Sequence, residues 1–463
     1  MTSRLVVVSN RVPDGHASAA GGLAVALLDA LRDHGGVWLG WSGHVVDSDI
    51  DAPRLRHSRQ ANIRRVTFDL DRRTHEGYYC GYSNGALWPV LHGRVDLARF
   101  DPGQWEDYRR ANRWFAHALM HMLGEQDLVW IHDYHLLLVA QELRSLRSRH
   151  RIGLFLHTPL PAPDALAALP GHQRLLGALF DFDLVGLQTR GDLAHLADYL
   201  QAELGARRDG DDAFVHRGRR LRVQAFPIGI DAEAFRDLLR EREAQDIQGL
   251  LRRQYARREL LVAVDRMDYS KGIPQRLQAL RELYSHHPED RGRATLIQIA
   301  VPGREGVQAY RELSAEVERL SGALNGDFGE LEWIPLRLLR RAVSRRRLAG
   351  LFHASKAALV TPLRDGMNLV AKEYLAAQDR QDPGVLILSR FAGAAEQLGG
   401  AVLVNPYDVE GVAEAIHQAL HMSREQRCER HRELIACVEQ HDARWWSRSF
   451  VAALQGCKPG LQE

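Results

Sequence analysis

The stretch AALVTPLRDGMNLVAKEYLAAQ (357–378) decides the fold. It opens with the apolar run AALV, passes through a turn that contains Asp365 and Gly366, and ends in an apolar helical pattern. A continuous apolar run, rather than an alternating one, is typical of a strand that is covered on both faces of a parallel sheet. The stretch therefore predicts a strand, a turn and a helix, the repeating unit of an α/β protein. Glu373 stands out because it places a carboxylate among the apolar residues of that helix.

The same unit recurs along the chain in two blocks, one ending near residue 230 and one beginning near residue 260. The polar, charge-rich stretch 231–246 lies between them. This organisation predicts two Rossmann-like, doubly wound parallel-sheet domains, residues 1–235 and 236–440. The runs that we interpret as strands are 4–10, 62–70, 127–133, 151–157, 182–188, 223–229, 260–266, 295–301, 357–363, 384–389 and 401–406.

Two segments depart from this alternation. Residues 206–222 (ARRDGDDAFVHRGRRLR) interrupt it and favour an exposed hairpin or loop. Residues 337–347 (RLLRRAVSRRR) form the strongest patch of one charge sign. Because aromatic residues are not interleaved with these cations, the patch favours the solvated face of a helix over a nucleic-acid-binding surface.

The composition gives no indication of a nucleic-acid or membrane partner, since 61 Lys and Arg offset 59 Asp and Glu to a net charge of +2. A chain of 463 residues suits two domains of roughly 200 residues each. The four cysteines form no CxxC pair, and the apolar run at the N-terminus is too short for a secretory signal. These features predict a reduced, cytoplasmic protein without a membrane span.

Polar residues cluster where the predicted strands end. Because ligands of parallel sheets bind beyond the carboxyl ends of the strands, and because pockets often form between domains, we expect a site in the cleft between the two domains. The strand-end residues are Asn10 and Arg11, Asp133, His157, the loop DRMDYSKG (265–272), residues 302–304 and the turn that contains Asp365.

Two of these loops offer partners for a phosphate. Arg266 and Lys271 follow one strand, and two cations in one loop could neutralise a leaving diphosphate. A solvated surface loop explains them equally well. Gly21 and Gly22 precede a helical pattern and could let backbone N–H groups approach a phosphate, although an ordinary turn explains them too. Neither GxGxxG nor a P-loop motif occurs, which disfavours the common nucleotide-binding loops.

The aromatic residues and histidines in these motifs allow either a binding role or a structural role. His157, before a proline-rich loop, could bond a sugar hydroxyl or satisfy a structural contact. Trp41 and Trp88 could border a sugar or belong to the core. The motif HDYH (132–135) straddles a strand end, where successive side chains point to opposite faces, so a metal site is not expected there.

Taken together, the motifs carry a resemblance. SNRVP, GGLAVAL, WLGWSG, YYCGYSNGALWP, WIHDYHL, FLHTPLP, DRMDYSKG and TPLRDGMNLVAKEYLAAQ occur in this order. From about Arg4 to beyond Asn405 the chain resembles the trehalose-6-phosphate synthase family of retaining glucosyltransferases. The resemblance implies the GT-B architecture and transfer of glucose from UDP-glucose to glucose 6-phosphate, giving α,α-trehalose 6-phosphate and UDP. It also implies that no metal or cofactor is needed, that residues 441–463 form a helix returning to the first domain, and that the protein is a homo-oligomer (dimer or tetramer).

The resemblance also implies roles for individual residues. The acceptor phosphate would pair with Arg11 and Arg304, since guanidinium groups bind phosphate bidentately. The acceptor sugar would lie among Trp41, Tyr79, Trp88 and Asp133, with Trp88 and Thr158 selecting the anomer. In the donor site, Arg266 and Lys271 would bind the diphosphate, Glu373 the ribose, and His157 and Asp365 the glucose; the remaining residues are Gly21, Gly22, Val343, Gly366, Met367, Asn368, Leu369 and Val370. The catalytic set is Asp133, His157, Arg266, Lys271 and Asp365.

The chemistry implied by the family needs no pair of carboxylates. The leaving diphosphate itself accepts the proton of the acceptor hydroxyl, on the face from which the diphosphate departs. Catalysis therefore depends on cations at the diphosphate and on the placement of the acceptor. Two positions depart from the family pattern. Gly303 and Glu305 flank Arg304 where a small hydroxyl residue and a glycine are usual, and Val343 replaces an aromatic residue near the nucleobase, which leaves the donor base open.

Two alternatives remain open from the sequence. The first keeps the donor chemistry with another acceptor, such as glycerol 3-phosphate or a cyclitol phosphate. The second is a catalytically silent homologue that senses sugar phosphates. The second predicts loss of a cation at the diphosphate site, whereas Arg266 and Lys271 are both present.

Overall fold

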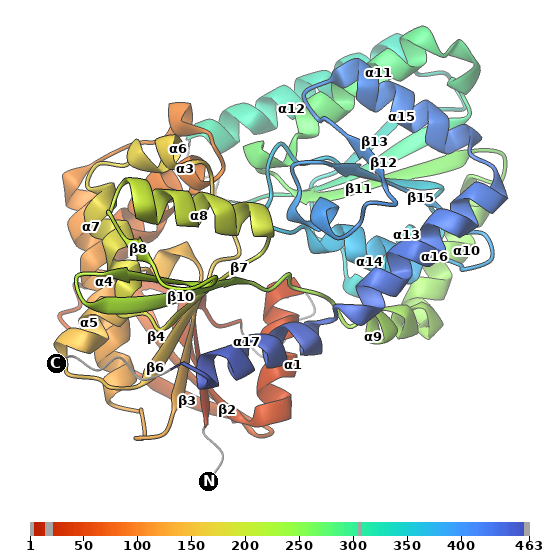
Figure 1. The fold of residues 1–463 in the computed structure, drawn as a ribbon. Coiled ribbons are helices and arrows are strands. Elements are labelled where there is room, and N and C mark those ends of the chain that lie inside the picture. Colours follow the sequence, from red (N-terminus) through yellow and green to blue (C-terminus); the bar gives the residue numbers. More distant parts are fainter. Residues whose placement is uncertain (1–3, 14–21, 304–307, 458–463) are drawn as a thin grey trace. The chain divides into compact units, whose positions relative to one another are not determined.

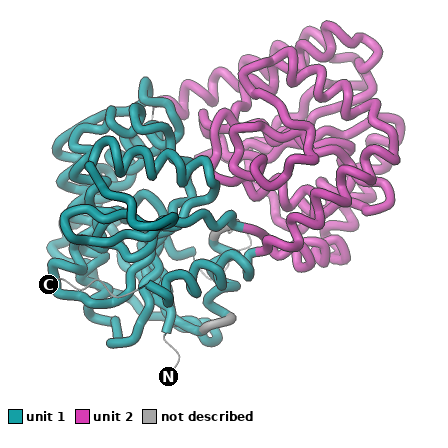
Figure 2. The backbone as a smooth tube through the Cα atoms, viewed as in Figure 1, with its two compact units in different colours: residues 1–228, 443–463 teal, residues 229–442 magenta. Residues whose placement is uncertain are grey.

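The computed structural model describes residues 4–13, 22–303 and 308–457, and it divides the chain into two compact units (Figure 2). Unit 1 comprises residues 1–228 and 443–463, and unit 2 comprises residues 229–442. The sequence predicts domain boundaries at 235/236 and 440/441, which lie a few residues from the boundaries of these units. Each unit is an α/β body built around a mostly parallel sheet, which confirms the predicted fold class (Figure 1).

Unit 1 contains one mixed sheet. In its described part, ten strands follow the order β3-β4-β2-β1-β5-β6-β7-β10-β9-β8. Neighbours from β4 to β10 are parallel, and β3, β9 and β8 add antiparallel pairs at the two edges. The bounds are β1 Leu5–Arg11, β2 Gly36–Val46, β3 Arg56–Gln60, β4 Ile63–Asp71, β5 Leu128–His132, β6 Arg151–Phe155, β7 Leu184–Leu187, β8 Arg207–Arg208, β9 Ala213–His216 and β10 Arg219–Ala225. The central strands are buried along most of their length, as continuous apolar runs predict.

Helices and helical turns surround this sheet. The α-helices are α1 Gly22–His34, α2 Arg72–Thr74, α3 Trp88–Leu91, α4 Pro102–Met120, α5 Val139–Ser145, α6 Pro163–Ala167, α7 His172–Gly177, α8 Arg190–Ala202 and α17 Ala443–Gln455. A π-helical segment, η1 His75–Leu87, and the 3₁₀ turns η2 Val95–Leu97, η3 Tyr134–Leu136 and η4 Ala178–Asp181 complete the unit.

The C-terminal helix α17 packs on the sheet of unit 1. Phe450 lies against β6 and β7, where a Cβ atom added to Gly153 or Gly186 would come within 2.7 Å of its ring. The ring also stacks on Trp130 of β5, with centroids 4.7 Å apart. Glycine at both positions is therefore what lets the helix lie close to the strands.

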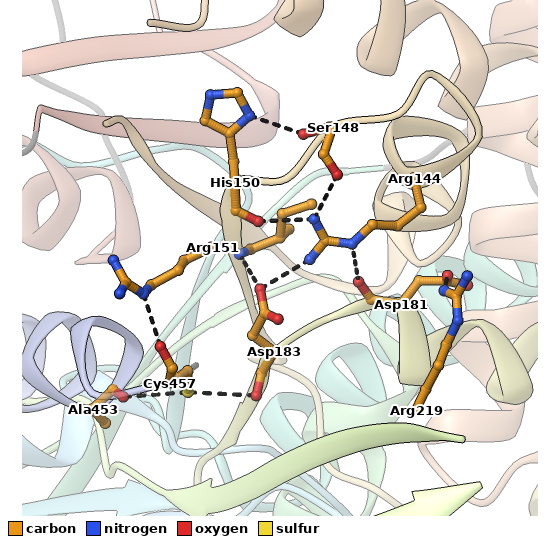
Figure 3. A network of polar contacts seen from close by, with 10 residues as sticks. Arg144, Ser148, His150, Arg151, Asp181, Asp183, Arg219, Ala453 and Cys457 are labelled. Atoms are coloured by element: carbon orange, nitrogen blue, oxygen red, sulfur yellow. Dashed lines mark hydrogen bonds and ion pairs between the residues drawn. The ribbon is translucent and has the colours of Figure 1, made fainter. Parts of the chain in front are cut away.

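A polar network fixes the end of this segment (Figure 3). Arg144 donates to Asp183 Oδ2 at 2.9 Å, and the same carboxylate oxygen accepts from Ile152 N at 2.7 Å. Arg151 Nε donates to the carbonyl of Cys457 at 2.8 Å. The residues that follow α17 are thus tied to β6 and to the turn before β7.

Unit 2 has a simpler sheet. In its described part, six strands run parallel in the order β13-β12-β11-β14-β15-β16. The strands are β11 Glu259–Arg266, β12 Ala294–Val301, β13 Leu336–Leu339, β14 Ala357–Val360, β15 Val385–Ser389 and β16 Val402–Val404. The helices are α9 Ala232–Asp237, α10 Arg242–Gln254, α11 Ile273–His286, α12 Gln308–Phe328, α13 Arg345–His353, α14 Leu369–Ala377, α15 Val409–His421 and α16 Arg424–Gln440, with 3₁₀ turns η5 Leu238–Arg240, η6 Tyr269–Lys271, η7 Pro288–Asp290 and η8 Gly393–Glu396.

Three details differ from the sequence-based expectations. Residues 213–225 form the predicted hairpin, but its apolar side chains Phe214 and Leu221 are buried, not exposed, because β10 joins the sheet beside β7. The prediction of one helix face over 337–347 is wrong, since Leu336–Leu339 is strand β13 and α13 begins only at Arg345. Strand β2 was not among the expected strands. Within the described ranges, no helix has the length and apolar character needed to cross a membrane.

Candidate active site

The two loops that follow β11 and β14 interlock in unit 2. Gly272 adopts a left-handed φ of +66°, and an added Cβ atom would lie 2.4 Å from the carbonyl oxygen of Thr361. Leu363 N donates to Ser270 O at 2.7 Å. Glycine is needed here for the turn and for the close approach of two backbones, so the positions of Lys271 and Asp365 are set together.

Lys271 and Asp365 form an ion pair at this junction. Lys271 Nζ donates to Asp365 Oδ2 at 2.6 Å, and the two side chains are only 10% and 16% exposed. Asn368 Nδ2 donates to the same oxygen at 3.0 Å. Three of the predicted donor-site residues are therefore brought together, and the lysine charge is held at a fixed point at the carboxyl end of the sheet.

Arg266 comes from the same loop but lies nearer to solvent. It is the last residue of β11, and its guanidinium lies 3.9 Å from the carboxylate of Asp268. Asp268 is buried and accepts from Ser270 N at 3.0 Å. Both predicted diphosphate cations thus lie on one loop, Lys271 buried and Arg266 half-exposed.

Arg276 supports this loop and was missed by the sequence analysis. It is fully buried in α11 and donates to Asp265 Oδ2 at 2.6 Å and to Thr361 Oγ1 at 3.0 Å. Its remaining amino group donates to the carbonyl of Lys271 at 3.2 Å. An arginine in an amphipathic helix usually indicates a solvated face, so the sequence held no signal for this contact.

The turn between β14 and α14 holds the predicted sugar and nucleotide residues. Asn368 precedes the helix with a φ of +76°, and Gly366 and Met367 are buried beside it. Asp365 N donates to Phe391 O at 3.1 Å, and Ala394 N donates to Met367 O at 2.8 Å. The first backbone N–H groups of a helix have no partner within it, so this rigid turn presents donors suited to an oxyanion.

Glu373 lies one turn into α14 and is buried. Burial raises the pKa of its carboxyl above the ordinary value, and Arg345, whose guanidinium is 3.3 Å away, partly offsets that effect. Arg345 begins α13, in the basic run that the sequence analysis assigned to solvent. It therefore belongs to the site, while Val343 lies half-buried in the loop before it.

In unit 1, an aromatic cluster gathers the predicted acceptor residues. The Trp41 and Tyr79 rings lie 5.6 Å apart, and Tyr79 stacks on His135 at 5.9 Å. The guanidinium of Arg11, at the end of β1, lies 5.9 Å from the centre of the Trp41 ring. Tyr79 belongs to η1, a π-helical segment of the kind that often occurs at functional sites.

Trp88 contributes to a neighbouring part of unit 1. It is buried and packs on His92 and Tyr134, with ring centroids 4.0 Å and 5.7 Å away. Tyr134 in turn contacts His135, which joins Trp88 to the aromatic cluster through one intermediate ring. Trp88 thus serves as packing in this structure as well as being a candidate for the acceptor site.

Asp133 and His157 meet where β5 and β6 end. Asp133 has a φ of +75°, a conformation that few residues other than glycine adopt, and its Oδ1 accepts from His157 N at 3.2 Å. Such backbone strain is concentrated at functional sites. Thr158, the next residue, is buried.

The half-buried His157 pairs with the buried His132. The His157 Nε2 and His132 Nδ1 atoms are 3.1 Å apart, and Gln188 Nε2 lies 3.4 Å from His157 Nδ1. Burial lowers the pKa of His157 to about 3 and also lowers the pKa of His132 well below its ordinary value. Both imidazoles are therefore neutral at pH 7, which suits hydrogen bonding to a sugar rather than charge compensation.

Some predicted residues cannot be placed. Gly21, Arg304 and Glu305 lie outside the described residues, and Gly22 is described only as the first residue of α1. Gly303, the residue before Arg304, is described and lies in the loop after β12. The structure therefore gives no geometry for the predicted contact between Arg304 and the acceptor phosphate.

Comparison with known proteins gives one consistent match. The family model described as glycosyltransferase family 20 matches residues 4–456. The trehalose-6-phosphate synthase of Sinorhizobium fredii is 44% identical over 453 residues, 97% of each chain. A solved structure of the α,α-trehalose-phosphate synthase (UDP-forming) of Burkholderia xenovorans in complex with glucose-6-phosphate is 42% identical, with a TM-score of 0.95 over 98% of this chain and 100% of that one. A structure from E. coli bound with UDP-2-fluoro glucose is 40% identical, with a TM-score of 0.94 over 99% and 100% of the two chains.

Proposed function

Because this chain belongs to glycosyltransferase family 20, we propose that it transfers glucose from UDP-glucose to glucose 6-phosphate with retention, giving α,α-trehalose 6-phosphate and UDP. The observation that carries the proposal is the contact of Lys271 with Asp365, beside Arg266, at the carboxyl end of the unit 2 sheet. A nucleotide sugar needs a fixed positive charge where its diphosphate departs and an acceptor for the sugar hydroxyls beside it.

The diphosphate is the place where charge develops. As the bond to glucose breaks, negative charge accumulates on the diphosphate oxygen, and Lys271 and Arg266 stabilise it. An ammonium group has three donors, and the bond to Asp365 takes one of them. Since Lys271 is largely withdrawn from water, its interaction with a phosphate oxygen is stronger than that of an exposed lysine.

The remaining donor contacts follow from the turn before α14 and from Glu373. The backbone N–H groups of residues 367–370 approach the donor at the helix start, and the carboxylate of Glu373 accepts from both ribose hydroxyls. The guanidinium of Arg345 lowers the pKa of this buried carboxyl, which favours its charged form and partly offsets the effect of burial. Val343 meets the nucleobase through its backbone.

The acceptor contacts belong to unit 1. Arg11 pairs with the phosphate of glucose 6-phosphate, and the sugar lies against Trp41, Tyr79 and Trp88. Arg304, which lies outside the described residues, remains a further proposed partner of the phosphate. Asp133 accepts from an acceptor hydroxyl. His157 lies against the donor glucose as a neutral imidazole, consistent with its lowered pKa, and its two ring nitrogens face His132 and Gln188.

The transfer step then needs no carboxylate pair. The departing diphosphate oxygen takes the proton of the attacking acceptor hydroxyl on the same face of the sugar, so the new bond has the configuration of the old one. The rate enhancement comes from the positioning of the two substrates and from the cations at the diphosphate. We propose that neither a metal nor a cofactor takes part, and chelation by EDTA tests this directly.

A panel of substrates tests the proposed function. Purified full-length protein is assayed with UDP-, GDP- and ADP-glucose, each against glucose 6-phosphate, glycerol 3-phosphate and inositol 1-phosphate. Turnover is expected with glucose 6-phosphate and fastest with the UDP donor. Turnover only with another phosphorylated acceptor, or tight binding of both substrates without any transfer, would overturn the proposal in favour of one of the two alternatives.

Two further proposals concern the location and the assembly of the protein. We propose a reducing, cytoplasmic location, as the sequence predicts; among the described residues, the four cysteines form no disulfide. We also propose that the protein is a homo-oligomer, and sedimentation velocity measures its mass in solution. A monomeric mass would contradict this part of the proposal.

A further inference from the structure

Helices α11 and α15 lie side by side in unit 2 (Figure 1). A group of histidines and carboxylates lies at the end of α11 and along α15. Helix α15 presents Glu414, His417 and His421 at spacings of three and four residues, which places them on one face. The turn η7, just after α11, supplies Glu289 and Asp290. None of these residues belongs to the proposed donor or acceptor contacts.

The centre of the group is a buried carboxylate that meets two imidazoles. Asp290 has no exposed side-chain surface. Its Oδ2 lies 2.8 Å from His417 Nδ1, and its Oδ1 lies 3.0 Å from His421 Nε2. One ligand atom from each of the three residues falls within 4.8 Å of the other two.

These distances suit a divalent transition metal. Zinc binds imidazole nitrogen and carboxylate oxygen at about 2.0–2.2 Å, so neighbouring ligand atoms of a tetrahedral site are roughly 3.3–3.6 Å apart. Small side-chain movements would open the present contacts to that spacing. Two imidazoles and one carboxylate form a ligand set that zinc, copper and nickel favour, with water completing the coordination.

A third histidine, His287, orients the ring of His417. His287 stacks on His417 with ring centroids 3.8 Å apart, and its Nε2 lies 2.6 Å from Glu414 Oε1. The bond to Glu414 raises the pKa of His287 above its ordinary value. Such outer contacts fix the ring plane of a ligating histidine.

Two kinds of charge act on the cluster. Glu289, whose carboxylate lies 3.4 Å from His287 Nδ1, and Glu414 attract a cation. Arg293 repels a cation, because its own guanidinium lies 3.3 Å from the His421 ring and 3.9 Å from Asp290 Oδ1. Arg293 also donates to the carbonyl of Leu420 at 3.2 Å and is more than one-third exposed. Arg293 is thus the cation that occupies the neighbourhood of Asp290 when no metal is bound.

We propose that Asp290, His417 and His421 form a binding site for a divalent transition-metal ion that fastens α15 to the turn after α11. The site is structural and separate from glucose transfer. His417 and His421 are four residues apart in α15, but Asp290 and His417 are 127 residues apart, so the sequence did not indicate which carboxylate completes the set.

Calorimetry with zinc chloride tests the site on the full-length protein. The wild-type chain is expected to bind zinc saturably, and the variant His417→Gln/His421→Gln to bind it at least about tenfold more weakly. The control is His286→Gln, an exposed histidine of α11 that lies outside the cluster. Because the four cysteines also attract zinc, the variants, not the wild-type isotherm alone, locate the binding.

Two further readouts separate a metal site from a set of hydrogen bonds. Zinc should raise the melting temperature of the wild type and of His286→Gln, but not that of the double variant. Arg293→Gln should tighten binding, because it removes the opposing charge. Glucose transfer should be unchanged in all of these variants.

Two results would overturn the proposal. One is a wild-type chain without saturable zinc binding, and the other is a double variant that binds zinc and gains stability like the wild type. Neither result bears on the proposed transfer reaction, which is measured separately with metal-free substrates.

Discussion

Lys271 Nζ lies 2.6 Å from Oδ2 of Asp365, although the two residues are 94 positions apart in the chain. The contact exists because the loop after β11 and the turn after β14 lock together at Gly272. It places a cation and a carboxylate of the proposed donor site at one point of unit 2.

Loss of the lysine charge should affect the chemical step. Lys271→Met is expected to lower kcat by about 100- to 1000-fold, the usual effect of removing a preorganised group that stabilises developing charge. The control Lys356→Met removes a half-buried lysine elsewhere in unit 2 and should leave kcat nearly unchanged. Initial rates at saturating substrates measure both, and a Lys271→Met variant within a few-fold of the wild type would exclude the diphosphate role.

The pH dependence of donor binding should report Glu373. Burial raises the pKa of this carboxyl, and only its charged form accepts well from two ribose hydroxyls. The KM for UDP-glucose should therefore rise as the pH falls through that raised pKa. Arg345→Gln removes the neighbouring charge that lowers the pKa, so the rise should begin at a higher pH, whereas the exposed Arg347→Gln should not shift it.

The measurement is the KM for UDP-glucose as a function of pH, followed from neutral pH toward acid for as long as the protein stays folded. Glu373→Gln should raise the KM and abolish its pH dependence. A wild-type KM that stays flat, or that falls toward acid pH, would contradict the ribose assignment.

The position of Arg11 should control acceptor binding. A Cβ atom added to Gly43, whose φ is +96°, would lie 2.6 Å from the Arg11 guanidinium. Gly43→Ala should therefore displace Arg11 and raise the KM for glucose 6-phosphate. Arg11→Gln should raise it by about tenfold or more, since a hydrogen bond to a charged group contributes about 1.5–3 kcal/mol.

Gly93→Ala is the matched control for this prediction. Gly93 has a similar φ of +72°, but an added Cβ atom would meet nothing within 4 Å. The control therefore shares the backbone strain without touching Arg11, and its KM for glucose 6-phosphate should equal that of the wild type. If Gly43→Ala and Gly93→Ala behave alike, steric displacement of Arg11 is not the cause.

The buried histidine pair should make unit 1 less stable in acid. The pKa of His157 falls from 6.5 to about 3 on folding, so the unfolded chain binds more protons below pH 6.5. The free energy of unfolding should then fall as the pH drops, by up to about 1.4 kcal/mol per pH unit for this histidine. Above pH 6.5 the titration of His157 does not change the free energy of unfolding. The loss of stability grows as the pH falls from 6.5 toward 3.

Urea unfolding of the wild type and of His157→Gln at pH 7 and pH 5 measures this effect. The difference between the two pH values should be smaller in the variant, because glutamine does not titrate. His117→Gln, an exposed histidine of α4, should unfold with the wild-type pH dependence. Equal pH dependence in His157→Gln and the wild type would show that His157 is not held neutral by burial.

Much of the fold could be predicted because the central strands are buried on both faces. The apolar runs at β1, β5, β11 and β14 are visible in the sequence for that reason. Strand β2 was missed, since its sequence GVWLGWSGHVV contains three glycines and reads as a loop with aromatic residues. The edge strand β13 was missed because arginines dominate the run in which it lies.

The candidate site could be predicted only in part. Residues at the strand ends, such as Asp133, Lys271 and Asp365, were candidates because topology brings the strand ends of each sheet to one edge, and the family resemblance then implied their roles. Arg276 and Arg345 were not identified, because their importance depends on which side chain they meet. A charged residue on a helix looks the same in sequence whether it faces solvent or a buried carboxylate.

The most direct test of the central claim is proton NMR of the product formed by the full-length protein from UDP-glucose and glucose 6-phosphate. The proposed reaction predicts UDP and a non-reducing disaccharide phosphate in equal amounts, with the α configuration at both anomeric carbons. A β linkage, or release of UDP with free glucose and no disaccharide, would contradict it.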